Sequence, residues 1–278
     1  MKENINIEDY PMIKKGAKPG KTSVIIACTH GNETCGIYAF NSLITDLVIE
    51  SGIVIFCIGN PRALEKNERF TEMNLNRAFK EKELLTLEEM QTYEYERAQE
   101  IKLLLDDADA LLDIHSSKNI PAEQFIICEP NNYFISDRLP FDKRISGFEE
   151  YEPGGTESYM NSRSKIGIGI ECGQHDDPKS IDKATEAILS FLIAMEHIKG
   201  INKTQKQERL KISFLYKNIN KDFILSRVFK DFEKIEKDTL IGHDGEIPVF
   251  SPFESKILFA HDCKDKINQE CFLLAEIL

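Results

Sequence analysis

Residues 24–33 read VIIACTHGNE, and this stretch decides the class of fold. Its first half, residues 24–28, is short, apolar and rich in β-branched side chains, which is typical of a buried strand. Residues 34–48 have the apolar spacing of a helix, and IVIFCI at 53–58 again indicates a buried strand. A strand, a helix and a second strand in succession predict an α/β core.

The same alternation continues along the chain. Thr86 and Glu89 have the spacing of a capping box, which predicts a helix over 87–105. Asp177 as N-cap and Pro178 as the first helical residue predict another helix, which should end at Gly200. Further strands are expected at 110–114 (ALLDI), 124–128 (QFIIC) and 166–171 (IGIGIE).

The pattern changes near residue 201. The segment INKTQKQER at 201–209 is polar and linker-like, and short β-like pieces follow it at 211–215, 247–250 and 256–260. We therefore expect an α/β domain with a mixed sheet flanked by helices at 1–204, and a small β-rich domain at 205–278.

Composition narrows the class of protein. The 278 residues carry 35 Lys and Arg against 47 Asp and Glu, a net charge of −12, which excludes the basic surface of a nucleic-acid-binding protein. No apolar stretch approaches the roughly 18 residues of a membrane helix, and the first residues lack the apolar segment of a signal peptide. The seven cysteines, an odd number, lie mostly in apolar runs and indicate reduced thiols. We expect a cytoplasmic protein without nucleic-acid or membrane partners.

Polar residues follow two of the expected strands. His30 and Glu33 come after the strand at 24–28, and Asp113 and His115 end the strand at 110–114. A histidine with an acid three residues later is common by chance, so the first pair alone leaves open an ordinary surface pair. Because the carboxyl ends of parallel strands meet at one edge, the two sites together favour a His30, Glu33 and His115 metal site. Three protein ligands with a fourth position for water are typical of catalytic zinc.

Glu171 is the next candidate. In IGIGIE, Gly167, Gly169 and Glu171 share one face of the strand, and open space beside the carboxylate would suit a general base. An exposed edge strand with a solvated Glu171 explains the pattern equally well.

Cationic residues gather around these motifs in an otherwise acidic chain. Arg62, Arg69 and Arg77 lie in one stretch, and Arg163 follows Tyr159 by four residues. Arginines near a metal indicate an anionic substrate, because the guanidinium binds carboxylates through two hydrogen bonds. Taken singly, each could equally form a surface salt bridge.

Six motifs follow one another along the chain: THGNE (29–33), GNPRA (59–63), ERFTEMNLNRAF (68–79), YEYERAQEI (93–101), LLDIHSS (111–117) and GIECGQ (169–174). In this order they resemble the aspartoacylase/succinylglutamate desuccinylase family of zinc amidohydrolases, which is related to the zinc carboxypeptidases. The resemblance implies a carboxypeptidase-like α/β core over most of residues 24–200.

The resemblance also implies roles for individual residues. One zinc ion per chain would be held by His30, Glu33 and His115, and Glu171 would be the general base. Arg62 would polarise the scissile carbonyl. The substrate's carboxylates would be held by Asn76, Arg77, Tyr159 and Arg163.

Two features depart from the family. Asn74 stands where an Asp is common, and no tyrosine follows Tyr216 to match one from the family's C-terminal domain.

The implied activity is hydrolysis of a small anionic N-acyl amino acid, with an acidic, N-acetylaspartate-like amide as the first expectation. Desuccinylation, carboxypeptidase-like cleavage and a non-catalytic metal-binding protein on this fold are the alternatives. The acyl group, the amino acid and the oligomeric state stay open, a homo-oligomer included. His175 lies close enough to Glu171 in sequence to reach the site.

Overall fold

The computed structural model describes residues 7–119 and 121–278, which form two compact units. The first unit contains the described residues up to Asp142 together with Glu152–Gln207. The second contains Lys143–Tyr151 and Glu208–Leu278. The predicted domains at 1–204 and 205–278 stay a prediction about folding units. No helix in the described ranges is both long and apolar enough to cross a membrane.

The first unit is built on a mixed sheet, as predicted. Its strands lie in the order β1-β3-β2-β4-β7-β5; β3, β2, β4 and β7 run parallel, while β1 and β5 are antiparallel to their neighbours. The strands are β1 (Met12–Lys15), β2 (Lys18–Ala27), β3 (Ser51–Ile58), β4 (Ala110–Ser117), β5 (Gln124–Ile127) and β7 (Ile166–Gln174).

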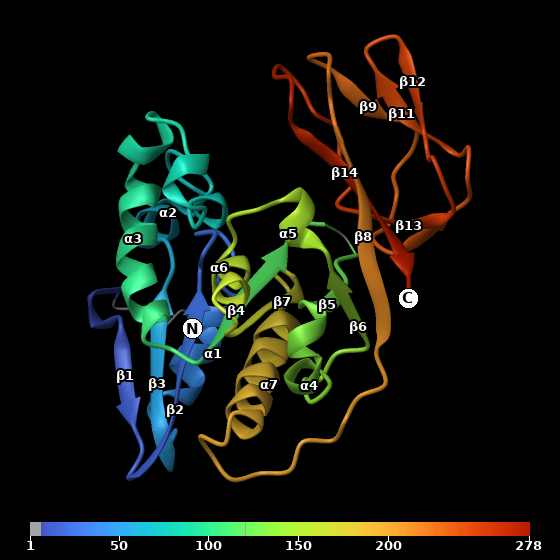
Figure 1. The fold of residues 1–278 in the computed structure, drawn as a ribbon. Helices are drawn as coiled ribbons and strands as arrows, with labels where there is room; N and C mark the ends of the chain where they lie inside the picture. Colours follow the sequence, from blue (N-terminus) through green and yellow to red (C-terminus); the bar gives the residue numbers. More distant parts are fainter. Residues whose placement is uncertain (1–6, 120) are drawn as a thin grey trace. The chain divides into compact units, whose positions relative to one another are not determined.

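Helices cover both faces of this sheet (Figure 1). One face packs with α1 and α7 over side chains such as Ile25 and Ile168, and the opposite face packs with α3 and α6 over Val24 and Leu111. The central strands are buried on both faces, which explains their continuous apolar runs. The helices of this unit are α1 (Cys35–Leu43), α2 (Pro61–Lys66), α3 (Tyr93–Asp106), α4 (Tyr133–Ser136), α6 (Thr156–Ser162) and α7 (Pro178–Ala194).

The first and last residues of several helices differ from the predicted ones. The capping box forms, with the Glu89 N–H donating to Thr86 Oγ1 over 3.1 Å, but it precedes only a 3-10 turn at Glu89–Gln91. Helix α3 begins at Tyr93, after the N-cap Thr92. The predicted helices at 34–48 and 177–200 end earlier, at Leu43 and Ala194, although Asp177 caps the latter as expected.

The second unit is β-rich, as predicted for the C-terminal region. Its first sheet has the order β6-β8-β14-β13-β10, and its second the order β12-β11-β9. The sequence patterns did not predict β6 and the helix α5 (Phe148–Tyr151), which come from within the α/β part of the chain. The strands are β6 (Lys143–Ser146), β8 (Glu208–Lys217), β9 (Phe223–Leu225), β10 (Glu233–Ile235), β11 (Leu240–Asp244), β12 (Ile247–Phe250), β13 (Ser255–Leu258) and β14 (Glu270–Ile277).

Candidate functional site

The structure brings the three predicted metal ligands together at the carboxyl edge of the first unit's sheet. His30 and Glu33 lie in the loop after β2, and His115 lies near the end of the neighbouring β4. Gly31 allows this loop to pack against α2, because a Cβ there would lie 2.1 Å from the carbonyl carbon of Ala63. One ligand atom from each of the three residues lies within 4.8 Å of the others, and all three side chains are buried.

Both histidines present the same ring nitrogen to the centre. Nδ1 of His30 and Nδ1 of His115 each lie 2.8 Å from an oxygen of Glu33. The remote nitrogens are held by other groups: Nε2 of His30 lies 3.0 Å from Asn74 Oδ1, and Nε2 of His115 lies 3.3 Å from Asp113 Oδ2. Such outer partners orient the rings and direct both Nδ1 atoms toward Glu33, where the three side chains could coordinate a cation. Asn74, at the position where an Asp is common in the family, can fill this role through its amide oxygen.

Burial and charge set the protonation of the three side chains. Burial lowers the pKa of His30 to about 4. Burial also acts to lower the pKa of His115, but Asp113 and Glu33 outweigh it and raise that pKa well above its usual value. For Glu33 burial acts to raise the pKa, and the two histidines outweigh it and hold the pKa well below its usual range. Without a metal, His115 therefore carries a proton that an incoming cation must displace.

Asp113 is fixed by two hydroxyl groups that the sequence did not single out. Thr29 Oγ1 donates to Asp113 Oδ1 over 2.8 Å, and Thr156 Oγ1, at the start of α6, donates to Asp113 Oδ2 over 2.6 Å. The Asp113 side chain is fully buried. Its position on β4 is therefore fixed by the loop after β2 and by α6.

Replacing Asp113 by Asn should weaken metal binding by about 10- to 100-fold, the usual cost of losing an outer partner of a histidine ligand. The shape is kept while the charge that supports His115 is removed. A competition titration with a zinc chelator measures the change, and Asp106→Asn, on α3 and outside the triad, is the matched control. Equal zinc affinity in the Asp113 and Asp106 variants would contradict the supporting role.

Glu171 lies beside the metal triad by strand register. In the parallel pair β4 and β7, His115 is the register partner of Glu171, and Asp113 is the partner of Gly169. The side chains of partnered residues lie on the same face of a sheet. The space around Gly167 is not open, because a Cβ there would lie 2.4 Å from the carbonyl oxygen of Glu157 in α6. The absence of a side chain at Gly167 therefore serves close packing of α6 and not access to Glu171.

The arginine that reaches the triad is Arg69. Its Nη1 donates to Glu33 Oε1 over 2.9 Å, and its backbone carbonyl accepts from the N–H of Gly31 over 3.2 Å. The Arg62 guanidinium is instead stacked on the ring of Tyr93, at 3.9 Å from the ring centre. Both arginines lie near the metal-site motifs in the sequence, but no sequence signal indicates which of the two side chains points toward Glu33.

Asn76 and Arg77 lie on the 3-10 turn that follows Asn74. Asn76 Oδ1 accepts from the N–H of Thr156 over 3.1 Å, which links this turn to α6. Arg77 forms an ion pair of 2.8 Å with Glu152 and donates to the carbonyl of Asn76. Asn76 is thus tied to the start of α6, whose Thr156 also holds Asp113, and Arg77 is tied to Glu152.

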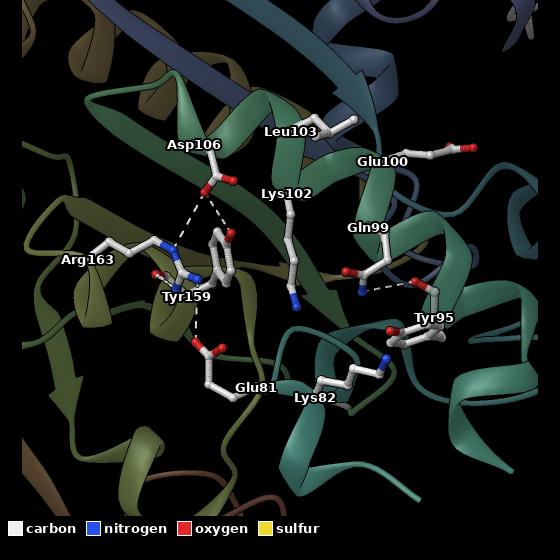
Figure 2. Close-up of a pocket in the computed structure, with 10 residues that line it drawn as sticks. All are labelled: Glu81, Lys82, Tyr95, Gln99, Glu100, Lys102, Leu103, Asp106, Tyr159 and Arg163. Atoms are coloured by element: carbon white, nitrogen blue, oxygen red, sulfur yellow. Dashed lines mark hydrogen bonds and ion pairs between the residues drawn. The ribbon is translucent and has the colours of Figure 1, made fainter. Parts of the chain in front are cut away.

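Tyr159 and Arg163 line a different pocket, of about 480 Å³, between α3 and α6 (Figure 2). The Tyr159 hydroxyl donates to Asp106 Oδ1 over 2.7 Å, and the Arg163 guanidinium lies 3.5 Å from the centre of the Tyr159 ring. Asp106 ends α3 just before the amino end of β4, whereas His115 lies near its carboxyl end, about 16 Å along the strand at ~3.3 Å per residue. The structure therefore does not bring Tyr159 and Arg163 to the metal triad.

Known proteins match this chain over much of its length. The sequence model of the succinylglutamate desuccinylase/aspartoacylase catalytic domain matches residues 19–195. The succinylglutamate desuccinylase of Shewanella pealeana is 25% identical, over 86% of this chain and 78% of that protein. The aspartoacylase of Danio rerio is 32% identical, over 55% of this chain and 54% of that protein.

Other matches are shorter or concern the fold alone. The match to the succinylglutamate desuccinylase of Idiomarina loihiensis spans only 20% of that protein's length. The crystal structure of succinylglutamate desuccinylase from Vibrio cholerae superposes with a TM-score of 0.77 at 20% identity, over 95% of this chain and 82% of that one. The domain match covers well over half of the chain, including every member of the metal triad. This chain therefore belongs to the succinylglutamate desuccinylase/aspartoacylase family.

Proposed function

We propose that this chain is a zinc-dependent amidohydrolase that cleaves the amide bond of an N-acyl amino acid. The observation that carries the proposal is the buried triad, in which Nδ1 of His30 and Nδ1 of His115 converge with Glu33. Two imidazole nitrogens and one carboxylate are a donor set that suits zinc, and they leave a fourth position for water or substrate. The seven free thiols agree with a cytoplasmic location, which is also proposed.

Zinc bound to His30, Glu33 and His115 would supply Lewis-acid activation of a water molecule and of the scissile carbonyl. Glu171, next to His115 in the sheet, would accept the proton that the attacking water loses and deliver it to the leaving amine. Arg69 would stabilise the negative charge that develops on the carbonyl oxygen, since its guanidinium already reaches Glu33. The carbonyl-polarising role that the resemblance gave to Arg62 is therefore assigned to Arg69 in this proposal.

Substrate carboxylates would be bound on the side of the site where Asn76 and Arg77 lie. The Arg77 side chain is 21% exposed and its guanidinium pairs with Glu152, and a bidentate contact with a substrate carboxylate would add to this pair. The first candidate substrate is an acidic N-acyl amino acid, the same class that the sequence predicts. N-succinyl amino acids are the second candidate, supported by the match to a desuccinylase over 86% of the chain.

A substrate panel tests the proposal directly. The zinc-loaded protein would be incubated with N-acetyl, N-formyl and N-succinyl derivatives of acidic and neutral amino acids, and with a peptide, while amine release is followed. Release from N-acetylaspartate or N-succinylglutamate decides between the two candidates. Cleavage of the peptide alone would favour the carboxypeptidase-like alternative. No release from any compound would favour a non-catalytic metal-binding protein.

Arg77 and Arg163 should respond differently to replacement. We expect Arg77→Ala to lower kcat/KM for acidic substrates by about 30-fold or more, the scale of ~2 kcal/mol or greater for a charged partner left unpaired. Arg163→Ala should change kcat/KM by less than about 3-fold, because its pocket contains none of the triad residues. Steady-state kinetics on acidic and neutral substrates makes the comparison. A larger loss of kcat/KM in the Arg163 variant would indicate that Tyr159 and Arg163 do bind the substrate.

A further inference from the structure

His175 is anchored to the strand that presents His115. Directly after β7, its backbone N–H donates to the carbonyl of Ser117 over 2.9 Å, and its Nδ1 lies 2.8 Å from Ser116 Oγ. Ser116 is buried and follows His115, and its backbone N–H donates to Glu33 Oε2 over 3.4 Å. The His175 ring therefore has a fixed position relative to two of the three proposed metal ligands.

The second ring nitrogen of His175, Nε2, can still form a hydrogen bond. The ring is half-buried, and within residues 7–119 and 121–278 its Nε2 has no hydrogen-bond partner. Burial lowers the pKa of His175 below its usual value. A neutral imidazole held through one nitrogen offers one directed hydrogen bond from the other.

His197 shows how a structural histidine in the same unit differs. Its ring is fully buried, its Nδ1 lies 2.9 Å from the carbonyl of Ser51, and its Nε2 lies 2.8 Å from Ser23 Oγ. Both nitrogens are thus engaged within the protein, as expected for a histidine that only joins elements. His175 engages one nitrogen with Ser116, the neighbour of His115, and the other has no partner within the described residues.

We propose that His175 contacts the substrate, donating from Nε2–H to a carbonyl or carboxylate oxygen of the bound N-acyl amino acid. Ser116 sets this tautomer when its hydroxyl donates to Nδ1, which leaves the proton on Nε2. The inference rests on the proposed function and assigns His175 a role that the mechanism above does not use. Ser116 is then a positioning residue, since it acts on the substrate only through the ring.

Paired amide replacements separate this role from a structural one. In His175→Gln the side-chain amide can reach the place of Nε2, whereas in His175→Asn it can reach only the place of Nδ1. A substrate contact predicts that KM rises about 10- to 100-fold in His175→Ala, the scale for losing a hydrogen bond to a charged group. Gln should recover part of this loss and Asn should not. Ser116→Ala should raise KM less, and the zinc content and kcat of all four variants should stay close to wild type.

The outcomes distinguish this inference from the proposed function. Unchanged KM in His175→Ala, or better recovery by Asn than by Gln, would overturn the substrate contact while leaving the hydrolase intact. A fall in melting temperature with unchanged KM would likewise assign His175 to joining β4 and β7. No turnover by the wild-type protein on the whole panel would overturn the proposed function, and this inference with it.

Discussion

Replacing Glu171 by Gln should lower kcat by about 10²- to 10⁴-fold, the range for losing a positioned general acid–base. Gln keeps the size of the side chain and its place beside His115 in the register of β4 and β7, but it cannot accept the proton from water. The metal ligands are untouched, so the zinc content should stay near one per chain. Steady-state kinetics and elemental analysis on the same preparation measure both quantities.

A matched control is available on the surface of the same unit. Glu186 on α7 is exposed and pairs with Lys183 at 3.0 Å, so Glu186→Gln removes a carboxylate of little energetic weight. Its kcat should equal that of the wild type. If Glu171→Gln also turned over substrate at nearly the wild-type rate, the general base would have to be another residue.

Removal of any one metal ligand should abolish zinc binding and turnover together. In His30→Ala, Glu33→Ala or His115→Ala only two donors remain, so affinity should fall by more than the roughly 10- to 100-fold that an outer partner costs. Glu33→Ala should also lower the melting temperature most, because it leaves His30, His115 and Arg69 without their shared partner. Zinc per chain, measured after dialysis against a weak chelator, is the direct readout.

The exposed His243 supplies the control for these three variants. His243→Ala removes an imidazole from β11 in the second unit and should leave zinc content and turnover unchanged. Undiminished zinc in all three ligand variants would refute the ligand assignment, whereas loss of zinc in the His243 variant would indicate a second site.

Much of the fold could be predicted because the signals are local. Short apolar runs bounded by turn residues located β2, β3 and β4, and the N-cap Asp177 located the start of α7. Helix ends have weaker local signals, since a capping box such as Thr86 with Glu89 stabilises one turn whether or not a helix follows. The strand β6 escaped prediction because its four residues, KRIS, carry no periodic pattern.

The residues of the candidate site likewise differ in how well the sequence predicts their positions. His30, Glu33 and His115 could be predicted to meet because parallel strands place their carboxyl ends at one edge. Tyr159 and Arg163 could not be placed by spacing alone. Tyr159 lies on α6 and Arg163 is the C-cap residue of this helix, and both side chains contact Asp106 at the end of α3.

The register of β4 and β7 requires that Glu171 lie on one particular face of β7 if it is to act as the proposed base. Glu171 lies on the face that carries His115, while its neighbours Ile170 and Cys172 are buried in the apolar cluster on the opposite face. Inserting one residue before Glu171 in β7 would exchange these faces, moving the carboxylate into the apolar layer under α7 and a hydrocarbon side chain beside the histidines. An insertion of two residues would restore the alternation. Relatives whose β7 differs by an odd number of residues between its start and this glutamate would therefore need a bulge to keep the same chemistry.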